Sequence, residues 1–208
     1  MLKSEHESNE YPFYAMLDRM QYINRWGLMP NNRTENLKEH SMDVAVVAHA
    51  LAIIRNRICL NGRKEVDPSY VMGAALLHDA SEIITGDLPT PIKYFNPEIT
   101  QAYKDIEGIA NDKLLSLLPE ELRDEYRKLL FQDPANPDET EAHRLVKAAD
   151  RICAYIKCIT EESSGNREFT PAKESILDSI RKIDYPEVAY FMEHFVPAYG
   201  QTLDQISE

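Results

Sequence analysis

Hydrophobic residues recur along this chain mainly at spacings of three and four, and the strict alternation typical of exposed strands is almost absent. In the segment 35–59 the spacing 3, 4, 3, 4, 3 places one stripe of side chains on a single helical face: Leu37, His40, Val44, Val47, Leu51 and Ile54. Glycine, which weakens helix interiors, is scarce, with 7 residues. The pattern predicts an all-α protein.

Residues that favour helix starts divide the chain into elements. Asn96 before Pro97 and Asn136 before Pro137 each combine an N-cap side chain with proline in the first turn. Gly86 is a helix stop. We expect a bundle of about seven or eight helices, covering 11–24, 35–59, 68–85, 97–118, 121–130 and 136–162, with two more that begin at Thr170 and Tyr185.

Two segments do not fit the helical pattern. One is WGLMPNNR at 26–33, and the other is GDLPTPIKYFN at 86–96, where Pro89 and Pro91 argue against helix. Loops held beside packed helices are common places for ligand contacts.

Length and charge argue against several classes of protein for this chain. The chain has 208 residues, which we interpret as one domain, 1–208, with residues 1–10 as a flexible extension. With 23 Lys and Arg against 35 Asp and Glu, the net charge of −12 argues against binding a nucleic-acid polymer. The sequence contains no apolar run long enough for a membrane span, and the N-terminus does not resemble a signal peptide. Three cysteines without a CxxC pair favour a reduced, cytoplasmic protein.

Polar residues stand where the helical pattern calls for apolar ones. His40 interrupts the stripe of its helix, and His78 with Asp79 interrupts the run VMGAALLHDASEII. Asp150 lies on the edge of a third apolar stripe, within 136–162. Glu82, four residues after His78 on the same predicted helix, is expected to lie over the His-Asp pair. We interpret the remaining histidines as structural or surface residues: His6, His49, His143 and His194.

An isolated buried carboxylate is costly unless it is paired or bound to a metal. Two imidazoles and two carboxylates suit a divalent cation and nearly neutralise it, and they leave coordination positions for water or substrate. Each residue alone has an ordinary structural explanation, such as a core histidine or a pair between Asp150 and Lys147 or Arg151. The combination on three helices predicts a catalytic metal site.

The ordered set His40, His78–Asp79 and Asp150 in an all-α chain resembles the HD-domain metal-dependent phosphohydrolases. The flanking segments resemble one branch, the bacterial HD-domain 5′-deoxynucleotidases: INRWGLM at 23–29, RTENLKEHSMDVAVVAHALA at 33–52, HDASEIITGDLPTPIKYFN at 78–96 and KAADRICAYIKCITEE at 147–162. The similarity covers nearly the whole chain, and the stretch 119–138 is its least distinctive part.

The resemblance implies a role for each matching position. The metal ligands would be His40, His78, Asp79 and Asp150, and Glu82 with Asp79 would serve catalysis. Substrate would contact the Arg25–Trp26 pair, His40, Asp79 and the loop Asp87, Leu88, Pro89 and Thr90. The family works as homodimers with divalent cations such as cobalt or manganese.

The expected activity is therefore hydrolysis of 2′-deoxyribonucleoside 5′-monophosphates to deoxynucleoside and phosphate. Two alternatives stay open at this point. One is another HD-domain chemistry, a phosphodiesterase or a (p)ppGpp hydrolase. The other is a non-catalytic helical module that binds a metal or a nucleotide for regulation.

Overall fold

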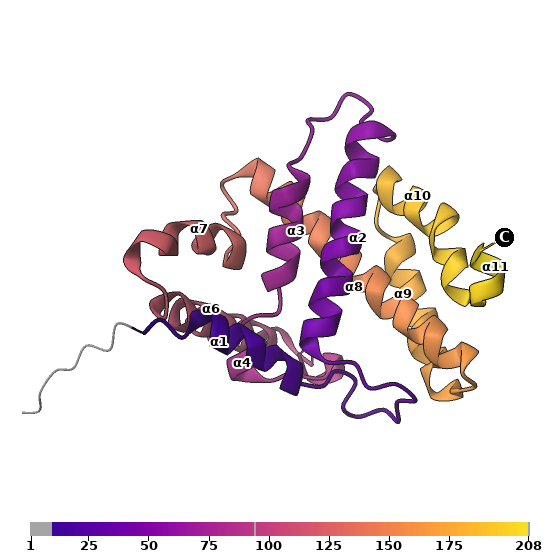
Figure 1. Cartoon of the computed structure of the whole chain (residues 1–208), viewed down its shortest axis with the longest axis horizontal. Coiled ribbons are helices and arrows are strands. Elements are labelled where there is room, and N and C mark those ends of the chain that lie inside the picture. The colour runs from indigo at the N-terminus through magenta and orange to yellow at the C-terminus, as the bar shows by residue number, and fades with distance from the viewer. Residues whose placement is uncertain (1–9, 94, 208) are drawn as a thin grey trace, which may run out of the picture.

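Three helices form the centre of the molecule in the computed structural model, which describes residues 10–93 and 95–207. They are α2 (Leu37–Arg57), α3 (Pro68–Leu77) and α8 (Pro137–Ser163), and all three pack on one another. Figure 1 shows α2 and α3 side by side, with α8 passing behind them. The stripe predicted on α2 is buried along its whole length, from Leu37 to Ile54.

The helix starts form as the cap residues predict. The Asn96 Oδ1 accepts a hydrogen bond from the Ile99 N–H at 2.7 Å, and Asn136 caps α8 in the same way through Asp138. Asn36 and Glu39 form a reciprocal capping box at the start of α2. This cap fixes the first turn of α2, which carries His40.

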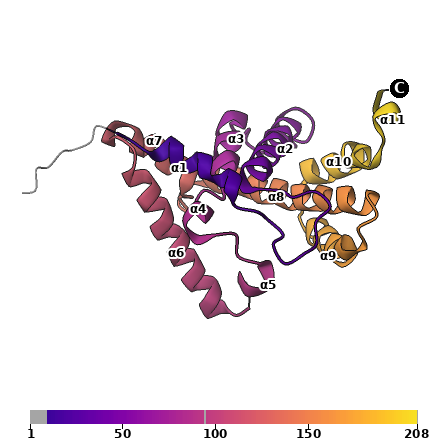
Figure 2. The same cartoon turned by 60° about the horizontal axis from the view of Figure 1, so that its bottom comes forward.

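The remaining elements pack on the two sides of the central helices (Figures 1 and 2). Phe13 and Leu77 belong to a small second core between the first helices and the segment that follows Asn96. The elements on that side are α1 (Phe13–Asp18), η1 (Arg19–Tyr22), α4 (Glu82–Thr85), α5 (Thr90–Lys93), α6 (Pro97–Ser116) and α7 (Glu120–Leu130). On the other side lie η2 (Arg167–Phe169), α9 (Thr170–Arg181), α10 (Pro186–His194), η3 (Val196–Gly200) and α11 (Leu203–Ser207).

The prediction of one continuous helix over 68–85 was wrong. α3 ends at Leu77, and the N–H groups of His78, Ala80 and Glu82 each donate to the carbonyl three residues earlier. These bonds wind residues 78–82 as a tight 3₁₀-type turn. The turn changes the direction of the chain directly at the His-Asp pair.

Two smaller differences concern the N-terminal helix and the proline-rich loop. The first helix tightens into a 3₁₀ turn and ends at Tyr22 instead of Asn24. The segment 86–96 contains one helical turn, α5, because Pro91 occupies its first turn, where a missing N–H costs nothing.

The all-α fold is confirmed. Within the described residues, seven helices have nine residues or more: α2, α3, α6, α7, α8, α9 and α10. None of the helices in these ranges combines the length and apolar character that a membrane crossing requires. Residues 1–9 of the proposed N-terminal extension lie outside the described residues, and the single-domain boundary stays a prediction.

Candidate active site

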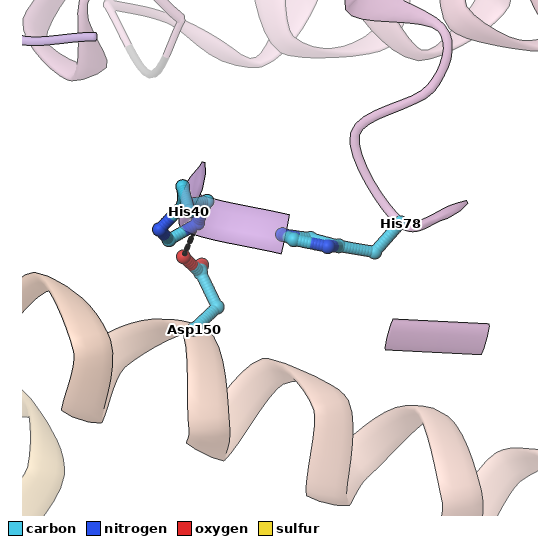
Figure 3. A group of neighbouring side chains, drawn as sticks. All are labelled: His40, His78 and Asp150. Atoms are coloured by element: carbon cyan, nitrogen blue, oxygen red, sulfur yellow. Dashed lines mark hydrogen bonds and ion pairs between the residues drawn. The ribbon is translucent and has the colours of Figure 1, made fainter. Parts of the chain in front are cut away.

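Three helical elements bring His40, His78 and Asp150 to one point. One potential ligand atom from each residue lies within 4.8 Å of the other two. Figure 3 shows the His40 ring facing the Asp150 carboxylate, with the His78 ring approaching from the other side. The His40 and His78 ring centroids are 5.4 Å apart. The convergence predicted from the sequence is present in the fold.

His78 is oriented to offer one nitrogen to a cation. Its Nδ1 lies 2.7 Å from the Ala75 carbonyl oxygen, so this nitrogen carries the hydrogen and donates it. In the neutral ring Nε2 then carries the lone pair, and this nitrogen is buried without a hydrogen-bond partner among the described residues. The Asp79 Oδ2 is 3.1 Å from that Nε2, but outside hydrogen-bonding geometry. A buried acceptor left in this state suits metal coordination.

His40 and the two aspartates complete the cluster. The His40 ring is fully buried, and its Nε2 lies 3.1 Å from Asp150 Oδ1 and 3.8 Å from Asp79 Oδ2. The His40 Nδ1 is buried without a hydrogen-bond partner in the described part of the chain. The Asp150 side chain is 40% exposed, which leaves the cluster accessible from outside.

Electrostatics keeps the carboxylates of this cluster ionised. Burial alone would raise the pKa of Asp79, but His78, His40 and Arg25 outweigh it and lower that pKa. The pKa of Asp150 is also lowered, because the hydrogen bond and charge of His40 exceed the cost of desolvation. Burial favours neutral His78, yet the charges of Asp79 and Asp150 raise its pKa to about 9. The two aspartates therefore favour positive charge at this position, either as a proton on His78 or as a divalent cation that takes the place of that proton.

Arg25 and Trp26 lie beside this cluster and share one partner. In the segment before α2, a backbone hydrogen bond joins Arg25 to Glu35, with the Arg25 N–H donating to the Glu35 carbonyl at 2.9 Å. The Glu35 Oε2 accepts from Arg25 Nε at 3.2 Å and from Trp26 Nε1 at 3.0 Å. Arg25 Nη1 also donates to Asp79 Oδ2 at 3.3 Å. The guanidinium therefore stands between the metal cluster and Glu35.

Glu82 is a carboxyl group in an apolar position. It is 5% exposed, and its Oε2 is without a hydrogen-bond partner among the described residues. Burial, with the negative charges of Asp79 and Asp87, raises its pKa to about 8. A carboxyl that holds a proton near neutral pH is suited to proton transfer.

The loop after α4 is fixed by α6. Gly86, at φ 74°, turns the chain, and its carbonyl accepts a hydrogen bond from the Tyr103 hydroxyl at 3.2 Å. Asp87, Leu88 and Pro89 follow as half-buried residues, and Thr90 begins α5. Asp87 is close enough for its charge and that of Arg25 to affect each other's pKa. These residues border the site, and their contact with substrate stays a prediction.

The structure thus brings most of the predicted residues together. His49 lies outside the cluster, half-buried on α2, as its position nine residues after His40 indicated. Sequence reasoning missed Glu35, which holds both Arg25 and Trp26. In the sequence, Glu35 stands directly before the N-cap residue Asn36, a position where a charged surface residue is common.

The donor set fits a divalent cation. It offers imidazole nitrogens and ionised carboxylates, a combination common to zinc, manganese and cobalt sites. The Nε2 of His78 faces this cluster and is buried without a hydrogen-bond partner among the described residues, a state that protein cores normally avoid. Partial exposure of Asp150 leaves room for water or substrate on the cation.

Comparisons with known proteins point to one family. Residues 12–199 match the model of the YfbR-like 5′-deoxynucleotidases. A 5′-deoxynucleotidase of Vibrio cholerae serotype O1 is 48% identical over 198 residues, which is 95% of this chain and 99% of that protein. A 5′-deoxynucleotidase of Yersinia pseudotuberculosis serotype I is 50% identical over 195 residues, or 94% of this chain and 96% of the relative.

Solved structures share the fold at lower identity. An HD-domain phosphohydrolase from Listeria innocua superposes with a TM-score of 0.73 at 22% identity, covering 90% of this chain and 87% of its own. The cyanophage S-2L HD phosphohydrolase DatZ, bound to dA and one catalytic Zn²⁺, superposes with a TM-score of 0.58 at 19% identity. That match covers 88% of this chain and 95% of DatZ.

Proposed function

This chain belongs to the YfbR-like 5′-deoxynucleotidase family, and from that premise we infer that it hydrolyses 2′-deoxyribonucleoside 5′-monophosphates to deoxynucleoside and phosphate. The observation that carries the chemistry is the convergence of His40, His78 and Asp150 beside a guanidinium. A phosphate monoester dianion needs positive charge from more than one side, and this site offers a cation position and Arg25.

His40, His78, Asp79 and Asp150 would hold the divalent cation. When bound there, the cation would supply Lewis acidity for activating water and for polarising the phosphoryl group. The Ala75 carbonyl keeps His78 in the tautomer with Nε2 free. Asp79 joins the cluster to Arg25, so the phosphate position is set by the same carboxylate that completes the ligand set.

Arg25 binds the phosphate and offsets charge on its equatorial oxygens. Its planar group offers a fork of donors that matches a phosphate. In the present arrangement Glu35 and Asp79 occupy part of this fork. We infer that a phosphate displaces or shares the contact with Asp79, while Glu35 keeps the guanidinium in place.

Glu82 handles the proton of the reaction. Its raised pKa gives it a proton to donate near neutral pH, and its buried Oε2 has acceptor capacity to spare. Either the attacking water or the departing 5′-oxygen is the natural partner for such a group. Asp87 adds negative charge near it, which helps to keep the proton on Glu82.

Trp26 selects the sugar. Its ring packs on Phe169, with centroids 5.3 Å apart, and is held by Glu35 through Nε1. A rigid indole next to Arg25 can crowd the space of a 2′-hydroxyl and leave it desolvated and unpaired. The loop of Asp87, Leu88, Pro89 and Thr90 forms the opposite wall. Base selection is expected to be weak.

The cellular setting extends this proposal. We propose that cobalt or manganese is the working cation and that the enzyme is a cytoplasmic homodimer, as the family resemblance implies. The three cysteines are buried free thiols, which agrees with a reducing compartment.

A substrate panel tests the proposed function. Phosphate release should be measured with Mn²⁺, Co²⁺ or Zn²⁺ from deoxynucleoside 5′-monophosphates, ribonucleoside 5′-monophosphates, a 3′-monophosphate, a phosphodiester and ppGpp. We expect turnover of 5′-monophosphates with the deoxy forms preferred. Preferential cleavage of the diester or of ppGpp would favour another HD-domain chemistry. Metal-dependent folding without any hydrolysis would favour a regulatory binding module.

A further inference from the structure

Trp26 is held in an unusual backbone conformation. Its φ of 58° lies in the left-handed region, which side chains with a Cβ rarely adopt. Such a conformation persists only when the surrounding contacts require it. The position of Trp26, which faces the sugar in the proposed function, therefore depends on the contacts that hold the segment 26–33.

Local bonds alone give this segment little support. The Trp26 carbonyl accepts from Met29 N–H at 2.9 Å and from Asn31 Nδ2 at 3.2 Å. Asn31 Nδ2 also donates to the Met29 carbonyl at 2.8 Å. These bonds close a turn, but they do not fix its place relative to the helices.

Glu161, near the end of α8, fixes that place. Its side chain is 1% exposed, although glutamate is rarely buried without partners. The carboxylate accepts from two backbone amides of the segment, Asn32 at 2.8 Å and Arg33 at 3.1 Å. It also accepts from the side chains of Asn166, at 2.8 Å, and Lys157, at 2.5 Å.

Lys157 and Asn166 bind the same segment themselves. Lys157 Nζ donates to the Arg33 carbonyl at 2.5 Å and is almost completely buried. Asn166 Nδ2 donates to the Pro30 carbonyl at 2.7 Å. We call Lys157, Glu161 and Asn166 the clamp. Its polar contacts tie three backbone positions, 30, 32 and 33, to the end of α8.

The clamp also touches the surface behind the indole. Lys157 Nζ lies 5.6 Å from the centroid of the Phe169 ring, on which the Trp26 ring packs. α8 carries both Asp150 and Glu161, eleven residues apart, which is about three helical turns. One helix, α8, therefore joins a residue of the metal cluster to the anchor of the segment that carries Trp26.

We propose that Glu161 and Lys157 are positioning residues that set Trp26 and Arg25 at a fixed distance from the metal cluster, and so determine both substrate affinity and discrimination against the ribose 2′-hydroxyl. The inference rests on the proposed function. The ligand is the sugar-phosphate part of a nucleotide, and the clamp acts on it only through the loop.

The test is Glu161→Gln in the full chain. Glutamine replaces one carboxylate oxygen by an NH₂ group, which cannot accept the hydrogen bonds that the surrounding N–H groups donate. It also leaves Lys157 buried without a counter-charge. We expect KM for dAMP to rise and kcat/KM to fall about tenfold to a hundredfold. The ratio of kcat/KM for dAMP over AMP should fall by about tenfold, with unchanged metal content.

Glu187→Gln is the matched control. Glu187 is fully buried and accepts a hydrogen bond from Arg63 Nη2 at 2.7 Å. Arg63 follows the C-terminal end of α2, whereas His40 lies in the first turn of that helix. Both variants should lower the melting temperature. Only Glu161→Gln should change KM and the deoxy-to-ribo ratio, because a general loss of folded protein reduces turnover of both substrates equally.

Two results would overturn the inference. One is a folded Glu161→Gln protein that keeps the wild-type KM and the wild-type ratio. The other is an equal change of the ratio in Glu187→Gln. If Glu161→Gln does not fold, Asn166→Ala, at a half-buried position, is tested by the same two quantities, KM for dAMP and the ratio of kcat/KM for dAMP over AMP. An unchanged ratio in that variant rejects the inference. Failure of the wild type to cleave dAMP would instead reject the proposed function, and this inference with it.

Discussion

Two clusters of charged and polar side chains lie along α8 in this protein, and they differ in how completely their buried atoms are hydrogen-bonded. The metal cluster of His40, His78, Asp79 and Asp150 contains buried nitrogens without hydrogen-bond partners among the described residues. In the clamp, the Glu161 carboxylate accepts four hydrogen bonds and Lys157 makes two. Both clusters use α8, and they lie about three turns apart on it.

The difference separates a structural site from a reactive one. A satisfied buried network holds its neighbours in one arrangement and has no capacity left for a ligand. A cluster with a buried, unpartnered imidazole nitrogen and lowered carboxylate pKa values has capacity for a cation that replaces the imidazole proton. Removing a residue should therefore affect binding and chemistry in the first cluster, and loop geometry and stability in the second.

The largest effect should follow loss of a metal ligand. His78→Ala or Asp79→Ala should remove bound metal and lower turnover by more than the roughly 10–100-fold that loss of an outer-shell partner costs. Metal content by elemental analysis and phosphate release from dAMP measure both. His49→Gln should keep full metal content, and equal metal loss in that control would refute the assignment of helix faces.

The next effect concerns Glu82, which belongs to the reactive region without being assigned as a ligand. Glu82→Ala should keep the metal and lose turnover by about a hundredfold or more, because a proton-handling group is removed. Single-turnover kinetics with metal analysis separates the two quantities. Activity close to wild type would show that Glu82 is only a buried structural carboxyl.

The contribution of the clamp to the free energy of unfolding should depend on pH in the acid range. The pKa of Glu161 is lowered to about 2, since its bonds to Lys157 and the loop amides outweigh the cost of burial. Its contribution is present above the unfolded pKa of 4.5 and is lost as pH falls from there towards 2, and it amounts to about 3 kcal/mol. Urea unfolding should show Glu161→Gln less stable at pH 7, with the difference from wild type shrinking below pH 4.5. A constant difference would contradict this assignment.

A smaller effect, on sugar selectivity, is expected at Trp26, which lies between the metal cluster and the clamp. Trp26→Ala should raise turnover of AMP relative to dAMP by about tenfold to a hundredfold, the usual range for a hydrophobic wall. The ratio of kcat/KM for the two substrates measures it. Loss of activity on both with an unchanged ratio would place selectivity elsewhere.

Much of this architecture was predictable because it depends on local rules. Asn96 and Asn136 cap their helices as the residue types indicate, and the buried stripe of α2 follows from its spacing. The convergence of His40, His78 and Asp150 could be predicted because polar residues stood at apolar positions. These features depend on neighbours only a few residues away in the chain.

The remaining features depend on tertiary contacts. Residues 74–85 contain neither glycine nor proline, so no local residue type marks the 3₁₀ turn that ends α3. Lys157 and Glu161 are four residues apart on a helix, a spacing typical of exposed ion pairs. Their burial arises because the segment 26–33, over a hundred residues earlier, covers them. Sequence spacing alone does not contain that contact.

The central claim is that the unsatisfied cluster is a catalytic cation site, and metal titration of the depleted enzyme tests it most directly. Protein freed of metal with a chelator should remain folded and release no phosphate from dAMP. Addition of Mn²⁺ or Co²⁺ should restore phosphate release and saturate near one cation per chain. Full activity in the depleted protein, or binding of one cation that leaves every deoxynucleotide intact, would contradict the account.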